Sequence, residues 1–448
     1  MKKLKLFFLY LLLTCGWIGL NAVVAHSDSA PLVLTLKKTL QLADERDVRM
    51  IVSQERFQQS LARIAQNRAF LFPQINVQAS QMRQTRDLRT AGITLPGDPL
   101  VGPFNSFDAR GQIIQTIFDP AAVARLKAAR ANEGLSSSEL RKTREDVLAL
   151  VAIMFIDARL AEQNQDYARA VFKKAEKKLT LVKKQWDLGT VSALDLQQAQ
   201  AEVAAAETLF QQTRMNVNET RSDLLAALGF DLDQPVQFAS ENELVLGKVS
   251  SAQDASLRFP DVEVAREELN LRKIQQSIER YEYWPKVSAL ADYGPSGVDP
   301  SNKSETYSLG VKMSWPIWDG GLRSARLQEE QSRFKEGQAQ LAYAERQAQT
   351  KIFNSGESLN RAQALVEEKK VRWAVAQTQL KLMEQRHADG SASDMDILDA
   401  QVQEARAQEE AREAEADLLT VQIHLWHAQG NMTAFIEEPI AGKTQGTP

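Results

Sequence analysis

The sequence predicts a mainly α-helical protein in which two copies of one helix–strand–strand–helix unit follow each other, with four strands of membrane-crossing length. Three observations support this fold class. Long tracts rich in Ala, Gln, Glu, Leu and Arg hold few of the chain's 21 glycines and 14 prolines, as is typical of long helices. Motifs of the first half return about 200 residues later. Four segments of about ten residues alternate apolar and polar side chains, as two-faced strands do.

The first 25 residues have the features of a secretory signal peptide. The basic start MKKLK is followed by the apolar stretch LFFLYLLLTCGWIGL and by small residues that suit cleavage after Ala25. Cys15 is the only cysteine, so removal of this segment would leave a chain without disulfides. The alternative is a lipoprotein acylated at Cys15, although Thr14 stands where such signals carry a smaller residue. Both alternatives predict an exported protein.

Composition argues against several classes of function. The chain has 54 basic and 58 acidic residues and a net charge of −4, without the basic patch that nucleic acids require. After the signal, no apolar stretch reaches the roughly 18–20 residues of a membrane helix. His424 and His427 could share a metal across one helical turn, but no further ligands accompany them. No phosphate loop or nucleophile–base motif is present either, so we predict no enzyme, no metal and no cofactor.

The internal repeat covers almost the whole chain. GTVSALDLQQAQ at 189–200 returns as GSASDMDILDAQ at 390–401, and the FD of 118–119 returns as the WD of 318–319. A period of this length indicates two domain-sized units and not a solenoid. We divide the chain into a signal peptide (1–25), a first repeat (26–230), a linker (231–258), a second repeat (259–431) and a polar C-terminal tail (432–448).

Each repeat is expected to contain one very long helix and two shorter ones. The long helices have no internal proline, and each would measure about 100 Å at 1.5 Å per residue. Two shorter helices placed end to end roughly match that length, which predicts a coiled-coil-like rod of paired helices. The expected helices are 34–69, 120–187 and 192–228 in the first repeat, and 260–283, 320–388 and 393–429 in the second.

The repeated twelve-residue motif predicts a tight turn between two antiparallel helices. Gly189 suits the left-handed position that ends a helix. Ser192 suits the N-cap of the next helix, and Asp195 the third helical position, where a carboxylate completes a capping box. The second copy repeats these residues as Gly390, Ser393 and Asp396.

The alternating segments predict four strands that a membrane could accommodate. Ten residues span a bilayer as a tilted strand, with apolar side chains toward lipid and polar ones toward a lumen. Four strands leave open edges, which a bilayer does not tolerate, so several chains would have to combine their strands. The other interpretation is a small sheet in a soluble domain. The strands are expected at 74–80, 108–118, 286–293 and 307–318, with Trp284, Tyr293, Tyr307, Trp315 and Trp318 near their ends as an aromatic girdle.

The ordered set of motifs, in two copies, resembles the TolC-like outer-membrane efflux proteins over nearly the whole mature chain. The resemblance rests on the repeated unit, the FD and WD junctions and the two Gly-x-x-Ser-x-x-Asp tips. It implies a homotrimer in which each chain gives four strands to one twelve-stranded barrel in outer-membrane lipid, above a helical tunnel in the periplasm. The implied function is the exit duct of a tripartite efflux or type I secretion system. An inner-membrane RND or ABC pump would deliver substrate through a periplasmic adaptor.

The resemblance also assigns roles to the tips. Asp396 and Asp399 match positions that ring the closed aperture with carboxylates, where they would attract cations. Asp396 could equally be no more than a first-turn helix residue, and the first repeat has Gln198 in place of Asp399. The residues expected to contact the adaptor are Gly189, Thr190, Val191, Ser192, Asp195, Gly390, Ser391, Ala392 and Ser393.

Two positions depart from the family pattern. Ala392 stands where some members carry an arginine that helps to hold the closed state, and His387 stands where an aromatic residue is common. Arg386 is a nearby candidate for the missing contact. An exported coiled-coil scaffold of the periplasm remains the alternative to a duct, and lipid-facing strands would distinguish the two.

Overall fold

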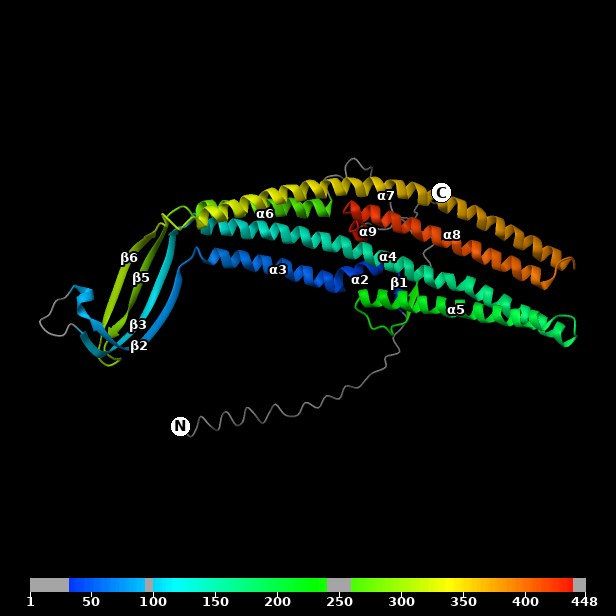
Figure 1. Ribbon diagram of the computed structural model, residues 1–448, viewed down its shortest axis with the longest axis horizontal. Coiled ribbons are helices and arrows are strands. Elements are labelled where there is room, and N and C mark those ends of the chain that lie inside the picture. Colours follow the sequence, from blue (N-terminus) through cyan, green and yellow to red (C-terminus); the bar gives the residue numbers. More distant parts are fainter. Residues whose placement is uncertain (1–31, 93–99, 240–258, 438–448) are drawn as a thin grey trace, which may run out of the picture.

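The computed structural model describes residues 32–92, 100–239 and 259–437. The predicted signal peptide with Cys15, most of the linker and the end of the tail lie outside the described residues. A four-stranded sheet stands at one end of a long helical body and bends away from the helix axes (Figure 1). Within the described residues, no helix has both the length and the apolar character needed to cross a membrane.

Two very long helices run the length of the body, as predicted. Helix α4 has 68 residues and α7 has 67. Helices α2, α3 and α5 lie along α4, while α6 and α8 lie along α7 (Figure 1). The helices are α2 (Leu36–Arg46), α3 (Val48–Ala69), α4 (Pro120–Asp187), α5 (Ala193–Ala227), α6 (Pro260–Tyr281), α7 (Leu322–Ala388), α8 (Asp394–Ala428) and the short α9 (Ala434–Glu437).

The first predicted helix is in fact two helices that meet at Asp47. This residue has an extended backbone (φ −61°, ψ 129°) and caps α3 by accepting a 2.7 Å hydrogen bond from the N–H of Arg49. The Arg49 guanidinium also binds the Asp47 carboxylate. The prediction of one helix over 34–69 was therefore wrong, because the Asp47 side chain starts a new helix at this point.

The four-stranded sheet is antiparallel throughout, in the order β2-β3-β5-β6. Its strands are longer than the predicted ten residues: β2 (Gln74–Asp87), β3 (Leu100–Phe118), β5 (Lys286–Gly297) and β6 (Lys303–Ser314). Trp315, expected inside the last strand, lies just beyond its end. Pro316 follows it, and a proline cannot donate to a strand ladder.

The register of the sheet confirms its two-faced pattern. Ile113 pairs with Ile75 on one side and Ala291 on the other, and Ala291 pairs in turn with Leu309. The neighbouring row carries Asn76, Gln112, Asp292 and Ser308. Because successive side chains of a strand point to opposite faces, one face of the sheet is apolar and the other is polar.

The main apolar core lies midway along the helical body. There β1 (Leu32–Leu34) pairs in parallel with β4 (Val236–Phe238), a strand inside the predicted linker. The ring of Phe238 meets Phe155 of α4 edge-on at 5.4 Å between centroids. Met432 is fully buried in the same core, and its N–H donates a 2.6 Å hydrogen bond to Glu145. The segment predicted as a polar tail thus begins with a buried residue.

The FD and WD motifs form the junctions between the sheet and the long helices. Asp119 caps α4 by accepting a hydrogen bond from the Ala122 N–H at 3.0 Å. Asp319 accepts from the N–H of Gly321 at 3.2 Å and from that of Arg323 at 3.1 Å. A carboxylate here satisfies amides that would otherwise be unpaired at the start of a helix.

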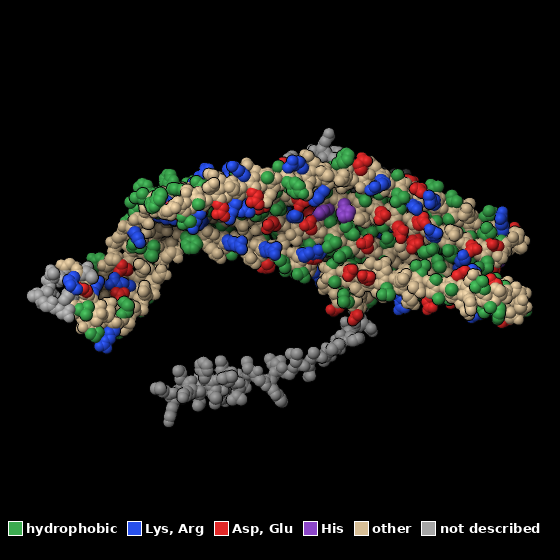
Figure 2. Space-filling model, viewed as in Figure 1, with side chains coloured by type: hydrophobic (Ala, Val, Ile, Leu, Met, Phe, Trp, Pro, Cys, Tyr) green, Lys and Arg blue, Asp and Glu red, His purple; other side chains and the backbone are tan. Residues whose placement is uncertain are grey.

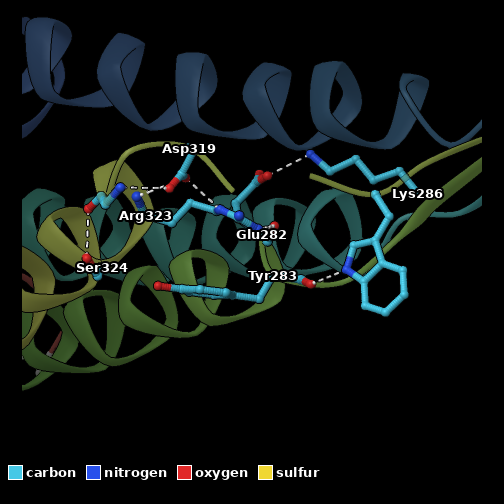
Figure 3. A network of polar contacts seen from close by, with 8 residues as sticks. Glu282, Tyr283, Lys286, Asp319, Arg323 and Ser324 are labelled. Carbon is cyan, nitrogen blue, oxygen red and sulfur yellow. Dashed lines mark hydrogen bonds and ion pairs between the residues drawn. The ribbon is translucent and has the colours of Figure 1, made fainter. Parts of the chain in front are cut away.

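The second junction is a polar network around Arg323 (Figure 3). The guanidinium of this buried arginine donates to Asp319 at 2.6 Å and to the carbonyl of Glu282 at 3.3 Å. It also lies 4.7 Å from the ring centroid of Tyr283. Lys286 of β5 reaches the Glu282 carboxylate at 2.7 Å. One arginine therefore ties the end of α6 to the start of α7 where the sheet begins.

Candidate functional site at the hairpin tips

Two helical hairpins, α4–α5 and α7–α8, end at the tip of the body farthest from the sheet (Figure 1). In the first tip, Gly189 adopts the left-handed conformation at φ 72°, and its N–H donates to the carbonyl of Trp186 at 2.8 Å. The N–H and the hydroxyl of Thr190 both donate to the carbonyl of Gln185 at 2.9 Å. These bonds satisfy the last carbonyls of α4, as a glycine-terminated helix end does.

The second tip repeats this geometry. Gly390 has φ 75°, and its N–H donates to the carbonyl of His387 at 2.9 Å. Ser391 replaces Thr190 and makes the same two bonds to the carbonyl of Arg386, at 2.8 Å from its N–H and 3.0 Å from its hydroxyl. The sequence similarity of the two copies thus extends to their hydrogen bonds.

Both returning helices begin with a complete capping box, as predicted. The Asp195 carboxylate accepts from the N–H of Ser192 at 2.9 Å and from its hydroxyl at 2.7 Å. The hydroxyl of Ser192 lowers the pKa of Asp195, followed by its backbone N–H. For Asp396, the backbone N–H of Ser393 is the larger cause of a lowered pKa, and the Ser393 hydroxyl adds to it. Both carboxylates are thereby held in the ionised form.

The predicted tip residues are almost all exposed. Val191 and Ala392, at equivalent positions, are the two that are half-buried. Asp396 and Asp399 are both exposed near the start of α8, three residues apart. Asp399 is not isolated, because its carboxylate forms an ion pair with Lys174 of α4. The predicted aperture residues therefore differ: Asp396 is bound by its own helix cap, and Asp399 by the other hairpin.

The two positions that depart from the family pattern lie in the second tip. His387 contacts Asp394 at 2.8 Å between Nε2 and Oδ1, which links the end of α7 to the start of α8. Arg386 uses its carbonyl to accept from Ser391. Its guanidinium has no ion pair among the described residues, so the candidate named from the sequence holds no neighbouring hairpin in this structure.

The two hairpins are joined through α4 and α8. Near the middle of the body, His427 of α8 contacts Asp146 of α4 at 2.6 Å. Farther toward the tips, Arg412 donates to the carbonyl of Gln163 at 2.7 Å. Among the described residues, the ion pair between the two hairpins that lies nearest to the tips joins Lys174 and Asp399. On the face shown in Figure 2, charged side chains of both signs are scattered along the body, and histidine side chains lie near its middle.

The structure assigns the two helical histidines to different surroundings. His427 pairs with Asp146, while burial and then the nearby His427 lower the pKa of His424. Among residues 32–92, 100–239 and 259–437, no group of three or more His, Cys, Asp or Glu side chains is placed to hold a metal ion.

Sequence analysis missed Lys174 as a site residue. The available signal was a run of three lysine pairs, FKKAEKKLTLVKK, which ends about one turn before the first tip. Six lysines on one helix near two predicted aspartates suggest a charge contact, but only the packing of α4 on α8 selects which lysine makes it. The paired hydroxyls of Thr190 and Ser391 were included in the predicted tips without a bonding role.

Fold and tips together define a class: chains built from two long helical hairpins and one four-stranded sheet. Comparisons agree with this class. The toluene efflux pump outer membrane protein TtgF of Pseudomonas putida is 24% identical over 406 residues, covering 87% of this chain and 81% of the relative. The alkaline protease secretion protein AprF of Pseudomonas aeruginosa is 22% identical, covering 71% and 68%. The CmeC outer membrane channel of Campylobacter jejuni shares the fold at a TM-score of 0.77, with 15% identity and coverage of 88% and 85%.

Residues 39–230 and 252–431 match the outer membrane efflux protein family, and the chain belongs to that family. The match extends over both repeats. The resemblance seen in the sequence motifs is therefore confirmed, as is the outer-membrane location.

Proposed function

We propose that three copies of this chain form an exit duct in the outer membrane, with the helical body in the periplasm. The duct passes substrate from an inner-membrane RND or ABC pump, received through a periplasmic adaptor, to the outside. Energy comes from the pump, and the duct itself performs no chemistry. TtgF is named for toluene efflux and AprF for alkaline protease secretion. The proposal therefore includes both a tripartite efflux system and a type I secretion system.

The two-faced sheet with two open edges carries the proposal. In the described residues β2 pairs only with β3, and β6 only with β5. Leu309 and Val311 of β6 are 80% and 70% exposed, as are Ile75 (70%) and Val77 (83%) of β2. Apolar side chains this exposed suit lipid, but unpaired strand edges do not. Pairing β6 of one copy with β2 of the next, three times over, removes every edge and gives a twelve-stranded barrel.

The helical body supports the same ring. First-repeat helices α3 and α5 lie on one side of α4, and α7 lies at the opposite side of the layer. On α7, Val371 (62% exposed), Val375 (51%) and Leu382 (46%) form an apolar stripe at helical spacing. Packing this stripe on a first-repeat helix of the next copy is a head-to-tail contact, which closes into a ring when the rotation allows.

The tips are proposed to form the periplasmic entrance. Gly189–Asp195 and Gly390–Ser393 supply exposed, rigidly bonded turns for an adaptor. Asp396 and Asp399 are proposed to ring the aperture, six carboxylates in the trimer. Such rings attract cations and can bind polyvalent cations that block passage.

Single-channel conductance in a planar bilayer tests this function. We expect the wild-type protein to form small cation-selective channels that polyvalent cations block, and the Asp396→Asn/Asp399→Asn variant to lose the block. Asp187→Asn, an exposed carboxylate at the end of α4, is the matched control and should keep it. If polyvalent cations block the double variant as they block the wild type, Asp396 and Asp399 do not line the aperture. Release of the protein as a salt-soluble periplasmic species that never conducts would replace the duct with a scaffold.

A further inference from the structure

The ion pair between Lys174 and Asp399 has a special place among the contacts that join the two hairpins. On the tip side of Arg412, it is the one ion pair between α4–α5 and α7–α8 among the described residues. Both side chains are accessible, with 32% of Lys174 and 55% of Asp399 exposed. The pair therefore fastens the start of α8 to α4, and solvent can reach it.

The internal repeat shows that this contact is made once per chain. At an offset of 201 residues, the counterpart of Lys174 is Val375 on α7, and the counterpart of Asp399 is Gln198 on α5. Valine and glutamine cannot form an ion pair. In the proposed ring, α7 of one copy meets α5 of the next. This contact between copies contains the apolar stripe of Val371, Val375 and Leu382. The seam inside a copy is ionic near the tips, and the seam between copies is apolar.

The rest of the α4–α8 contact does not separate easily. Ile423 and Trp426 of α8 are buried in the central core with residues of α4 and α5. When the tip of hairpin α7–α8 swings about this fixed region, its displacement is largest near the tip, and Lys174–Asp399 is the ion pair with α4 that lies nearest to the tip.

We propose that Lys174 determines both the closure and the charge of the aperture; this inference rests on the proposed function. In the closed state, each Lys174 holds α8 against α4 and neutralises one Asp399. The closed aperture then carries the charge of three Asp396 carboxylates instead of six carboxylates. When the tips part, the three Asp399 side chains are released, and the open pore becomes more attractive to cations. Some family members hold the closed state with an arginine at the position of Ala392. Here Lys174 takes over that role, so neither Ala392 nor His387 has to supply it.

Conductance of the Lys174→Gln trimer tests this inference, with Lys178→Gln as the control. Lys178 also forms an ion pair, with Glu202 at 2.6 Å, but inside one hairpin, and its side chain is similarly exposed (39%). An exposed pair shifts an equilibrium only a few-fold, and three acting together shift it on the order of tenfold. We expect Lys174→Gln to spend about tenfold more time in open states and to select cations more strongly. Lys178→Gln should match the wild type.

Two further measurements make the outcome decisive. The exchange Lys174→Asp/Asp399→Lys restores the pair with reversed charges and should restore the closed state, whereas Lys174→Asp alone should be open. In 1 M salt, where charges are screened over about 3 Å, the difference between Lys174→Gln and wild type should shrink. If wild type conducts with an Asp396-dependent block but Lys174→Gln behaves as wild type, the inference is overturned and the duct stands. If wild type never conducts, the proposed function fails and this inference fails with it.

Discussion

Ser393 and Asp396 exchange hydrogen bonds at the start of α8. The N–H and the hydroxyl of Ser393 donate to Oδ2 of Asp396 at 2.8 and 2.7 Å, and the Ser393 hydroxyl oxygen accepts from the Asp396 N–H at 3.3 Å. Oδ1 of Asp396 has no hydrogen-bond partner among the described residues. The carboxylate is therefore fixed in place and ionised, with one oxygen free of hydrogen bonds to the described residues.

Removal of the Ser393 hydroxyl should loosen this tip. Loss of a serine N-cap costs a helix about 1 kcal/mol, so we expect Ser393→Ala to fray the first turn of α8. Hydrogen exchange of the amides of residues 394–397 should become several-fold faster. Ser192→Ala is the matched control, because it removes the same cap from α5. Each substitution should speed exchange only at its own tip, and faster exchange at both tips in either variant would contradict this prediction.

A methyl group at Gly294 should prevent the sheet from forming. A Cβ at this position would lie 2.0 Å from the carbonyl oxygen of Ala109, inside the backbone of the neighbouring strand β3. We expect Gly294→Ala to prevent formation of the proposed trimer, which electrophoresis without heating would detect as a heat-sensitive band. Gly310→Ala on β6 is the control, since nothing lies within 4 Å of its Cβ, and it should assemble normally. Normal assembly of Gly294→Ala would show that β3 and β5 do not pair as described.

Arg323 should stabilise the sheet–helix junction far more than a surface arginine does. Its side chain is 10% exposed and binds Asp319, while its guanidinium stacks on Tyr283. Arg323→Gln gives up charge-assisted hydrogen bonds, at a cost of about 2 kcal/mol. The temperature at which the proposed trimer dissociates should fall. Arg326→Gln, one turn farther along α7 and exposed, should leave it unchanged; equal effects would assign no special role to the junction network.

Glu409 should make stability depend on pH near neutrality. Partial burial, followed by the charges of Glu413 and Glu410, raises its pKa from 4.5 to about 7. A carboxyl group whose pKa is higher in the folded protein than in the unfolded chain does not lower the free energy of unfolding at pH values below its unfolded pKa. The loss of folding stability that it causes grows between pH 4.5 and about 7 and stays constant at higher pH. Glu409→Gln should therefore raise the dissociation temperature at pH 8 but not at pH 4.

The exposed Glu367 of α7 provides the comparison for this titration. Glu367→Gln should leave the dissociation temperature close to that of the wild type at both values of pH. A Glu409→Gln variant that gains as much at pH 4 as at pH 8 would indicate improved packing instead of a removed charge.

Features set by neighbouring residues were predictable, and those set by distant packing were not. Glycine, serine and aspartate within seven residues determine each tip, so the turn and its cap follow from the sequence. Alternation likewise predicted both faces of the sheet. Asp47 shows the limit of such reasoning, because its extended backbone divides a segment whose composition suits one helix. Lys174 and Asp399 lie on helices from different repeats, and no local pattern pairs them.

The parallel pairing of β1 with β4 has a consequence for biogenesis. It joins Leu32, near the start of the first repeat, to Val236 in the predicted linker just after that repeat, so the first repeat can close on itself before the second repeat has crossed the inner membrane. The residue just after the second repeat, Met432, is instead buried against α4 of the first repeat and held by Glu145. The end of the second repeat is thus completed by contacts with the first repeat. Export from the N-terminus delivers the two halves in the order in which they can fold.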